Sequence, residues 1–301
     1  MNISISTNTL EYIKLMRLKH VLKNFLILAP IFFALKIFNV ELLLKDLLSV
    51  ILFTMVASAV YIINDYNDME ADRLHPRKKN RPLASGKISV KKAAILMSFL
   101  LSIGLAGLAL LDIKAGLFAL AYLLVNIAYS FGLKNIAILD IVIVSSGFLI
   151  RVFIGSYVTD IKLSSWIELM TFLLALLMVL GKRRDDILLL KETGVKARKS
   201  LDGYTEDFLN HAILLVATAA SVSYIQYTLS DEVIKRFNQE NLYITSFFVI
   251  IAILKYLQLI FVYNNSGYPV ETLYKSKFLQ VTVLLWVLSF GLLIYYDKFG
   301  L

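Results

Sequence analysis

Long apolar stretches constrain the fold of this chain more than any other feature of its sequence. Nine stretches have about the 20 residues that a helix needs to cross the hydrocarbon core of a bilayer. They cover residues 20–38, 42–63, 90–111, 115–131, 136–157, 163–181, 210–230, 242–262 and 278–296. Hydrophobic residues make up 58% of the 301 residues, more than a soluble domain of this size carries. The sequence therefore predicts an all-α membrane protein, a single domain over residues 1–301 whose nine transmembrane helices form a bundle.

Two long polar loops interrupt the apolar pattern, at about residues 64–89 and 182–209. An even number of stretches precedes each loop, so both are expected on the same side of the membrane. If the N-terminus is also on that side, the segments there hold 22 Lys and Arg residues and the opposite segments hold 7. Because cytoplasmic loops carry the excess of Lys and Arg, we expect a multi-pass protein of the inner or plasma membrane with a cytoplasm-facing active-site cavity. The net charge of +9 follows from this bias and does not call for nucleic acid; a homo-oligomer stays open.

The first polar loop begins with acidic residues that share one helix face. Asn64, Asp68 and Asp72 are spaced i, i+4 and i+8, and Asp65 lies beside Asp68 at i, i+3. Clustered carboxylates repel one another unless a cation lies among them, and hard oxygen ligands suit Mg²⁺ bound to a diphosphate. The basic residues that follow supply counter-charges for phosphate oxygens. The stretch therefore predicts a Mg²⁺–diphosphate site at a membrane surface, with an inert helix end and a lipid-binding basic patch as alternatives.

The second polar loop begins with a further charged run, Lys182-Arg183-Arg184-Asp185-Asp186. In a functional interpretation Lys182 and Arg183 are phosphate ligands, and Asp185 or Asp186 reaches a second Mg²⁺. A positively charged cytoplasmic loop with incidental acids is the alternative.

Three further residues lie at or within apolar stretches. Tyr129 and Lys134 follow the fourth stretch on the cytoplasmic side, where a Tyr is often only an interfacial anchor. Arg151 lies deep in the fifth stretch, where charge is costly. We expect Arg151 to face the bundle interior and to pair with an acid, a carbonyl or a substrate phosphate. The absence of cysteine from the sequence excludes disulfides and thiolate chemistry.

Taken together, these motifs resemble the UbiA superfamily of membrane prenyltransferases. The superfamily pattern is Asn64-Asp65-x-x-Asp68-x-x-x-Asp72, Arg81-Pro82-Leu83-Ala84-Ser85-Gly86, and Tyr129-Ser130 with Leu133-Lys134. Later motifs are similar to its decaprenyl-phosphate phosphoribosyltransferase branch, namely Leu139-Asp140, Gly181-Lys182-Arg183, and Arg198-Lys199-Ser200-Leu201 with Tyr204-Thr205. The resemblance runs from about residue 12 to about residue 296.

The resemblance implies Mg²⁺-dependent transfer of a 5-phosphoribosyl group from phosphoribosyl diphosphate to a polyprenyl phosphate, for cell-envelope polysaccharide precursors. An aromatic prenyltransferase of a quinone or haem pathway is the alternative within the superfamily. Prenylating members typically carry a second Asp-x-x-x-Asp motif, whereas Asp185 and Asp186 are adjacent here. A transporter would need functional charge near the midplane, but most of the charge gathers at one face.

The resemblance also implies the site residues. Lys79 and Arg81 would bind donor phosphates, and the other bases would divide between the ribose 5-phosphate and the acceptor phosphate. Tyr129 would orient a phosphate or stabilise developing positive charge with its ring. The expected metal ligands are Asn64, Asp65, Asp68 and Asp72; the expected substrate ligands are Lys79, Arg81, Arg151, Lys182 and Arg183; the expected catalytic residues are Asp68, Asp72, Tyr129 and Lys134.

Overall fold

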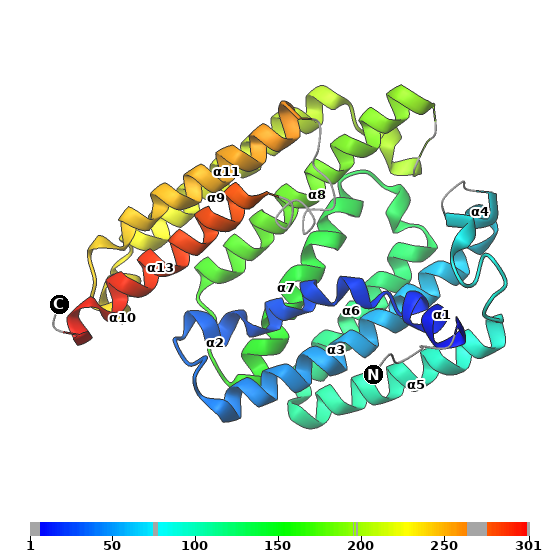
Figure 1. The fold of residues 1–301 in the computed structure, drawn as a ribbon, viewed down its shortest axis with the longest axis horizontal. Coiled ribbons are helices and arrows are strands. Elements are labelled where there is room, and N and C mark those ends of the chain that lie inside the picture. Colours follow the sequence, from blue (N-terminus) through cyan, green and yellow to red (C-terminus); the bar gives the residue numbers. More distant parts are fainter. Residues whose placement is uncertain (1–6, 75–77, 195, 197, 264–275, 300–301) are drawn as a thin grey trace. The chain divides into compact units, whose positions relative to one another are not determined.

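The computed structural model describes residues 7–74, 78–194, 196, 198–263 and 276–299, and the described chain is helical without strands. Its contacts divide it into two compact units, and Figure 1 labels the helices that they contain. Unit 1 comprises Met1–Lys134 and Ser146–Leu163, and unit 2 comprises Asn135–Ser145 and Ser164–Leu301. Helix α7 (Leu139–Thr159) contributes residues to both units. The prediction of one integral-membrane domain stays a prediction, and each unit is described by itself.

Unit 1 is built around the long helix α3 (Val40–Asn67), which packs against α5 (Val90–Leu111), α6 (Ile113–Phe131) and the 3₁₀ helix η1 (Leu18–Leu28). Its shorter elements are α1 (Thr7–Leu15), α2 (Ala29–Phe33), α4 (Met69–Leu74), η2 (Lys78–Asn80) and η3 (Leu133–Asn135), the last of which runs one residue into unit 2. Phe53 of α3 and Tyr122 of α6 meet in the core with ring centres 4.9 Å apart. Gly104 lets α5 approach α3 closely, since a Cβ there would lie 2.8 Å from the carbonyl oxygen of Leu52.

Polar side chains at the start of the long helices explain where these helices begin. Asn39, Ser89 and Asp112 accept hydrogen bonds from backbone N–H groups in the first turns of α3, α5 and α6, respectively. Such caps satisfy donors that have no partner within the helix. Asp112 also ends α5, so one residue sets the tight turn between α5 and α6.

Unit 2 consists of long helices that pack in sequence order. Helix α8 (Ser165–Thr193) packs against α9 (Glu206–Leu229), α9 against α11 (Ser246–Phe261), and α11 against α13 (Lys277–Phe299). The connecting elements are η4 (Lys199–Gly203), α10 (Asp231–Phe237) and η5 (Asn241–Thr245). Within the unit, the hydroxyl of Tyr224 binds Thr245 at 2.8 Å and accepts a hydrogen bond from the indole N–H of Trp286 at 2.7 Å.

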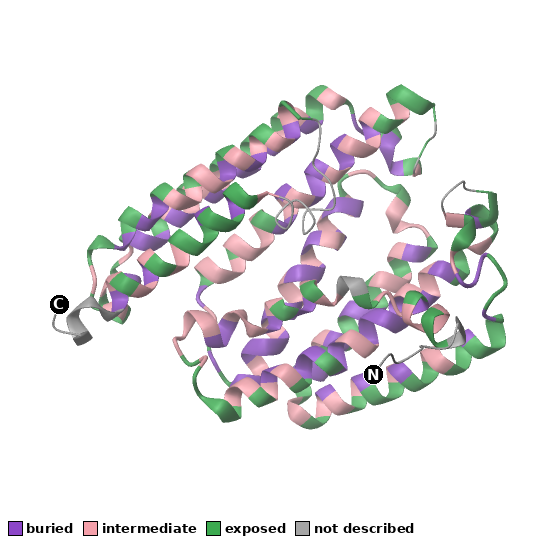
Figure 2. Ribbon diagram, in the orientation of Figure 1, coloured by how far each residue is buried: buried purple, intermediate pink, exposed green. Residues whose placement is uncertain are grey.

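The helices of unit 1 differ in how far their apolar residues are buried. Of the most apolar 18-residue window, 61% is buried for α3 but only 17% for α5 (Figure 2). The exposed face of α5 is apolar and includes Ile95, Phe99 and Leu110. Because a large exposed apolar surface is stable in lipid rather than in water, this pattern agrees with a multi-pass membrane protein.

The predicted count of nine spans is not confirmed. Among the described residues, eight helices are long and apolar enough to cross a membrane. The first predicted span, residues 20–38, is instead η1 followed by the short helix α2. Pro30 has no backbone N–H to continue the helical ladder, and Leu35 adopts a left-handed backbone with φ 56°. Val21–Phe33 is therefore shorter than a regular spanning helix.

Helix α8 differs from its prediction at the other end. The apolar stretch was expected to end at residue 181, but the helix continues to Thr193 and includes the whole charged run from Lys182 to Asp186. Lys and Arg are good helix formers, so charge ends an apolar stretch without ending a helix. Gly194, with φ 68°, then provides the left-handed cap.

Candidate active site

The acidic residues at the end of α3 lie in unit 1 and are surrounded by cations. Arg81 Nη1 lies 3.1 Å from Asp65 Oδ1 and 2.5 Å from Asp72 Oδ2. Arg17 Nη2 also forms an ion pair with Asp65, and Lys78 Nζ lies 3.9 Å from Asp72. Both carboxylates are buried, with side-chain exposures of 3%. This part of unit 1 therefore holds two buried carboxylates that share one guanidinium.

The local fold explains how these residues meet. The chain leaves α3 at Asp68 and re-forms a helical turn at once, since the N–H of Asp72 donates to the carbonyl of Asp68 at 2.8 Å. The acids therefore keep nearly helical spacing. The segment that follows η2 turns back at Gly86, whose φ is +73°, and buries Leu83 among residues of α3 and α5. The buried Leu83 and the turn at Gly86 fix the position of this segment, so that Arg81 lies beside Asp65 and Asp72.

A second set of contacts joins the end of α6 to the end of α3. Lys134 Nζ lies 2.5 Å from Asp68 Oδ1, so Asp68 pairs with a different cation from its two neighbours. Ser130 Oγ donates to Asn64 Oδ1 at 3.2 Å, and Asn67 Nδ2 donates to the Ser130 carbonyl at 2.7 Å. The structure thus brings the sequence-predicted Asn64, Asp68 and Lys134 together in unit 1. The roles proposed for them stay predictions.

Two buried carboxylates at this end of α3 offer the kind of oxygen atoms that a hard divalent cation binds. Because the two carboxylate oxygens bind the same nitrogen of Arg81, they lie less than about 6 Å apart. Carboxylate oxygens are the ligands that Mg²⁺ prefers. No three His, Asp or Glu side chains converge on one point among the residues that the structure describes. The predicted four-residue ligand set of Asn64, Asp65, Asp68 and Asp72 therefore stays a prediction.

The remaining sequence-predicted residues of unit 1 differ in their surroundings. Lys79 of η2 is exposed, and Tyr129 near the end of α6 is partly buried. Arg151 is buried, with 4% exposure; its Nε donates to Asn24 Oδ1 at 2.8 Å and its Nη1 donates to the carbonyl of Gly147. Arg77, one of the basic residues that follow the acidic residues in the first polar loop, lies outside the described residues.

Unit 2 contains its own buried polar cluster, centred on Asp140. This carboxylate accepts hydrogen bonds from Arg183 Nε at 2.7 Å, Ser200 Oγ at 3.1 Å and the Tyr204 hydroxyl at 2.5 Å. The Tyr204 hydroxyl in turn accepts from the N–H of Ile138 at 2.6 Å. Burial, together with the hydrogen bond to Asp140, raises the pKa of Tyr204, so this hydroxyl stays a proton donor. Asp140 is fully buried and well paired, so removing one of its partners would leave a buried charge uncompensated and destabilise this part of unit 2.

The rest of the charged run on α8 also forms contacts within unit 2. Arg184, for which no role was predicted, donates to Asn210 Oδ1 at 2.7 Å and to the carbonyl of Ile260 at 2.9 Å. Asp186 Oδ2 lies 3.4 Å from Arg183 and 3.2 Å from Arg198. Sequence spacing could not identify most of these partners, because they come from other helices. The phosphate-binding roles of Lys182 and Arg183 stay predictions.

The family model described as the UbiA prenyltransferase family matches residues 25–182. The chain is 35% identical over 295 residues, 95% of its length, to decaprenyl-phosphate phosphoribosyltransferase of Mycolicibacterium smegmatis, of which the match covers 92%. It is 36% identical over 94% of its length to the protein of that name from Corynebacterium glutamicum, of which 86% is covered.

Solved structures show the same fold. A UbiA homologue from Archaeoglobus fulgidus bound to DMAPP and Mg²⁺ matches with a TM-score of 0.65 at 19% identity. The match covers 95% of this chain and 96% of the homologue. A UbiA homologue from Aeropyrum pernix matches with a TM-score of 0.61 at 16% identity, covering 90% of this chain and 98% of the homologue.

Proposed function

Because this chain belongs to the UbiA prenyltransferase family and is a membrane transferase, we propose that it transfers a 5-phosphoribosyl group from phosphoribosyl diphosphate to a polyprenyl phosphate. The observation that carries the proposal is the similarity over nearly the whole chain to relatives named decaprenyl-phosphate phosphoribosyltransferase. We further propose that the reaction occurs at the cytoplasmic side of the inner or plasma membrane and supplies a cell-envelope polysaccharide precursor.

The proposed reaction forms one bond and breaks one. An oxygen of the acceptor phosphate attacks C1 of the ribose, and the bond between C1 and the diphosphate oxygen breaks, so that diphosphate leaves with the electron pair. The acceptor phosphate is already anionic at neutral pH and needs no strong general base. Bound Mg²⁺ would draw charge from the diphosphate and make it a better leaving group. A site rich in Asp, Lys and Arg and without Cys suits this chemistry.

Residues of unit 1 provide the groups for the donor. Asn64, Asp68 and Asp72, with help from Asp65, would hold the metal; the oxygens of Asp65 and Asp72 already share one cationic nitrogen. Arg81 would exchange its carboxylate partners for diphosphate oxygens once the metal neutralises those carboxylates. Within unit 1, Lys79, Tyr129 and Lys134 would bind and position phosphate groups. Lys182 and Arg183, which belong to unit 2, are proposed separately as phosphate ligands.

The test is a direct assay of transfer. Purified protein in nanodiscs receives Mg²⁺, labelled phosphoribosyl diphosphate and a polyprenyl phosphate, and the lipid fraction is extracted and analysed by mass spectrometry. We expect a lipid-linked 5-phosphoribosyl product and an equal amount of released diphosphate. If the protein makes no such product but prenylates an aromatic acid from a prenyl diphosphate, the proposal is wrong and the aromatic prenyltransferase alternative holds.

A further inference from the structure

Three cations gather in the interior of unit 1, beyond the acidic end of α3. Lys23 Nζ lies 5.8 Å from the ring centre of Phe148, and Arg151 Cζ lies 5.7 Å from the same centre. The two side chains therefore lie within about 12 Å of one another. Lys23 also interacts electrostatically with both Arg151 and Arg17. Two segments that are distant in sequence, the N-terminal segment with Arg17 and Lys23 and helix α7 with Arg151, thus bring positive charge to one region.

The charge of this cluster is not balanced within the described part of the chain. Arg17 pairs with Asp65, but neither Lys23 nor Arg151 forms an ion pair with a described residue. Arg151 is instead held by Asn24, the carbonyl of Gly147 and the faces of three aromatic rings, including Phe53 at 4.9 Å. Cations without a carboxylate partner, above all the buried Arg151, are costly in the interior of a membrane protein. An anion would remove that cost.

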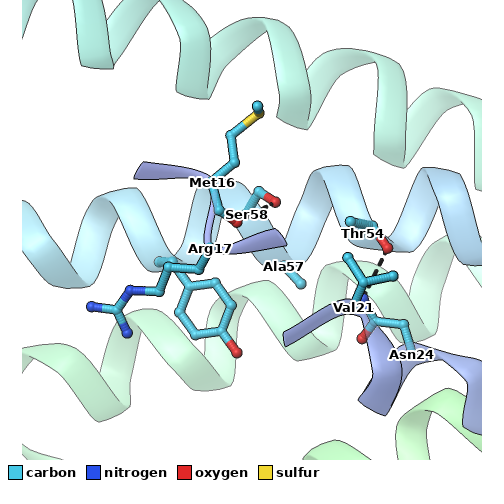
Figure 3. Close-up of a pocket in the computed structure, with 8 residues that line it drawn as sticks. Met16, Arg17, Val21, Asn24, Thr54, Ala57 and Ser58 are labelled. Carbon is cyan, nitrogen blue, oxygen red and sulfur yellow. Dashed lines mark hydrogen bonds between the residues drawn. The ribbon is translucent and has the colours of Figure 1, made fainter. Parts of the chain in front are cut away.

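A small pocket with both polar and apolar side chains in its lining lies beside Arg17. Its walls include Arg17 and Asn24 from the N-terminal segment and Thr54, Ser58 and Tyr61 from α3. Figure 3 shows Asn24 and Thr54 joined by the hydrogen bond that closes one side, at 2.9 Å between Asn24 Nδ2 and Thr54 Oγ1. Because Asn24 also accepts from Arg151, the pocket connects to the buried cation through one side chain.

The pocket and the acidic residues lie on one stripe of α3. Thr54, Ser58, Tyr61 and Asp65 follow at spacings of four, three and four residues, which places them on one helix face. At 1.5 Å per residue, Thr54 and Tyr61 are about 10 Å apart along the axis, and Asp65 is one turn further. Arg17 bridges the two regions, since its guanidinium lies 4.9 Å from the ring centre of Tyr61 and pairs with Asp65.

We propose that this pocket, with Lys23 and Arg151 behind it, binds a phosphate monoester. The proposal rests on the proposed function, in which both substrates carry such a group. The 5-phosphate of the donor is favoured over the lipid phosphate, because the pocket continues along the same helix face into the residues expected to hold the donor diphosphate. Lys23, Asn24 and Arg17 then join Arg151 as substrate-binding residues.

The first experiment removes the charge of Lys23 and the phosphate of the donor in turn. Lys23→Met is compared with Lys23→Arg, which keeps the charge, and with the matched control Lys45→Met, where the native Lys pairs with Glu41 at 2.7 Å and is 44% exposed. Each variant is assayed with phosphoribosyl diphosphate and with ribosyl diphosphate lacking the 5-phosphate.

We expect Lys23→Met to lower kcat/KM for phosphoribosyl diphosphate about 10- to 100-fold, the value of a charge-assisted hydrogen bond. With the donor that lacks the 5-phosphate, the loss should be less than about twofold. Lys23→Arg should restore most of the activity, and Lys45→Met should behave as the wild type. If the pocket binds the lipid phosphate instead, the loss is the same with both donors and the KM for polyprenyl phosphate rises. An equal loss with both donors and an unchanged lipid KM, or no loss at all, overturns the proposal.

Calorimetric titration of the wild type and Lys23→Met with ribose 5-phosphate and with a short prenyl phosphate separates this proposal from the proposed function. If either probe binds more weakly to Lys23→Met than to the wild type, the proposed phosphate pocket is supported. This holds even when the wild type makes no phosphoribosyl product, and in that case only the proposed function fails. Binding that is equal in both proteins, or that neither probe shows, overturns the pocket while an active wild type keeps the function.

Discussion

Replacing Tyr204 by Phe removes one hydroxyl from the polar cluster of unit 2 and changes little else. That hydroxyl donates to Asp140 at 2.5 Å and accepts from the N–H of Ile138 at 2.6 Å. Tyr204 is 5% exposed, so water cannot replace its bond to the carboxylate. Ile138, by contrast, is 48% exposed, so water can satisfy its N–H in the variant.

The expected loss of stability follows from these two contacts. A hydrogen bond to a charged group contributes about 1.5–3 kcal/mol, and the freed N–H adds little. At about 2–4 °C per kcal/mol, the melting midpoint of unit 2 should fall by about 3–12 °C. Asp140→Asn should cost more, about 3–5 kcal/mol, because it removes the negative charge that pairs with buried Arg183 at 2.7 Å.

Tryptophan fluorescence can measure this effect in detergent. The only two tryptophans, Trp166 and Trp286, both belong to unit 2, so a thermal melt reports on the part of the protein that contains Tyr204. Tyr243→Phe is the matched control, since Tyr243 is 49% exposed and its variant should melt within about 2 °C of the wild type. If Tyr204→Phe melts at the wild-type midpoint, the hydroxyl does not stabilise this cluster and the reasoning is refuted.

Three further outcomes test the site and the packing of unit 1. Asp68→Asn should abolish transfer while the protein still elutes as a folded monodisperse species, and retained activity would remove the metal role from Asp68. Excess EDTA should stop transfer by the wild type and Mg²⁺ should restore it; transfer that continues in EDTA contradicts the metal requirement. Gly155→Ala should lower the stability by about 1–3 kcal/mol, because its Cβ would clash with the backbone of Ile27. Less of this variant should therefore survive heating, as measured by size exclusion. In the control Gly291→Ala the new Cβ meets nothing within 4 Å, so its survival should equal that of the wild type.

The sequence predicted most long helices well, because their signal is local. Seven of the predicted stretches from residue 42 onward begin within about three residues of a long helix, as at α3 and α5, since twenty apolar residues have few other stable structures in lipid. The first stretch was wrong as a continuous span, because apolar composition does not report Pro30 or the left-handed backbone at Leu35. The predicted end of α8 was wrong because the charged residues that end the apolar stretch do not end the helix.

For the site, the sequence by itself determined the spacing of Asn64, Asp65, Asp68 and Asp72, because the helical period fixes which of them share a face. Only the tertiary structure decided their partners. Arg17 reaches Asp65 across 48 positions of sequence, and Asp68 pairs with Lys134 rather than with the neighbouring basic run. Asp140 likewise finds Arg183 and Tyr204 from distant segments. The physical reason is that a helix face depends on neighbouring residues, whereas an ion pair depends on which helices pack and on where each loop returns the chain.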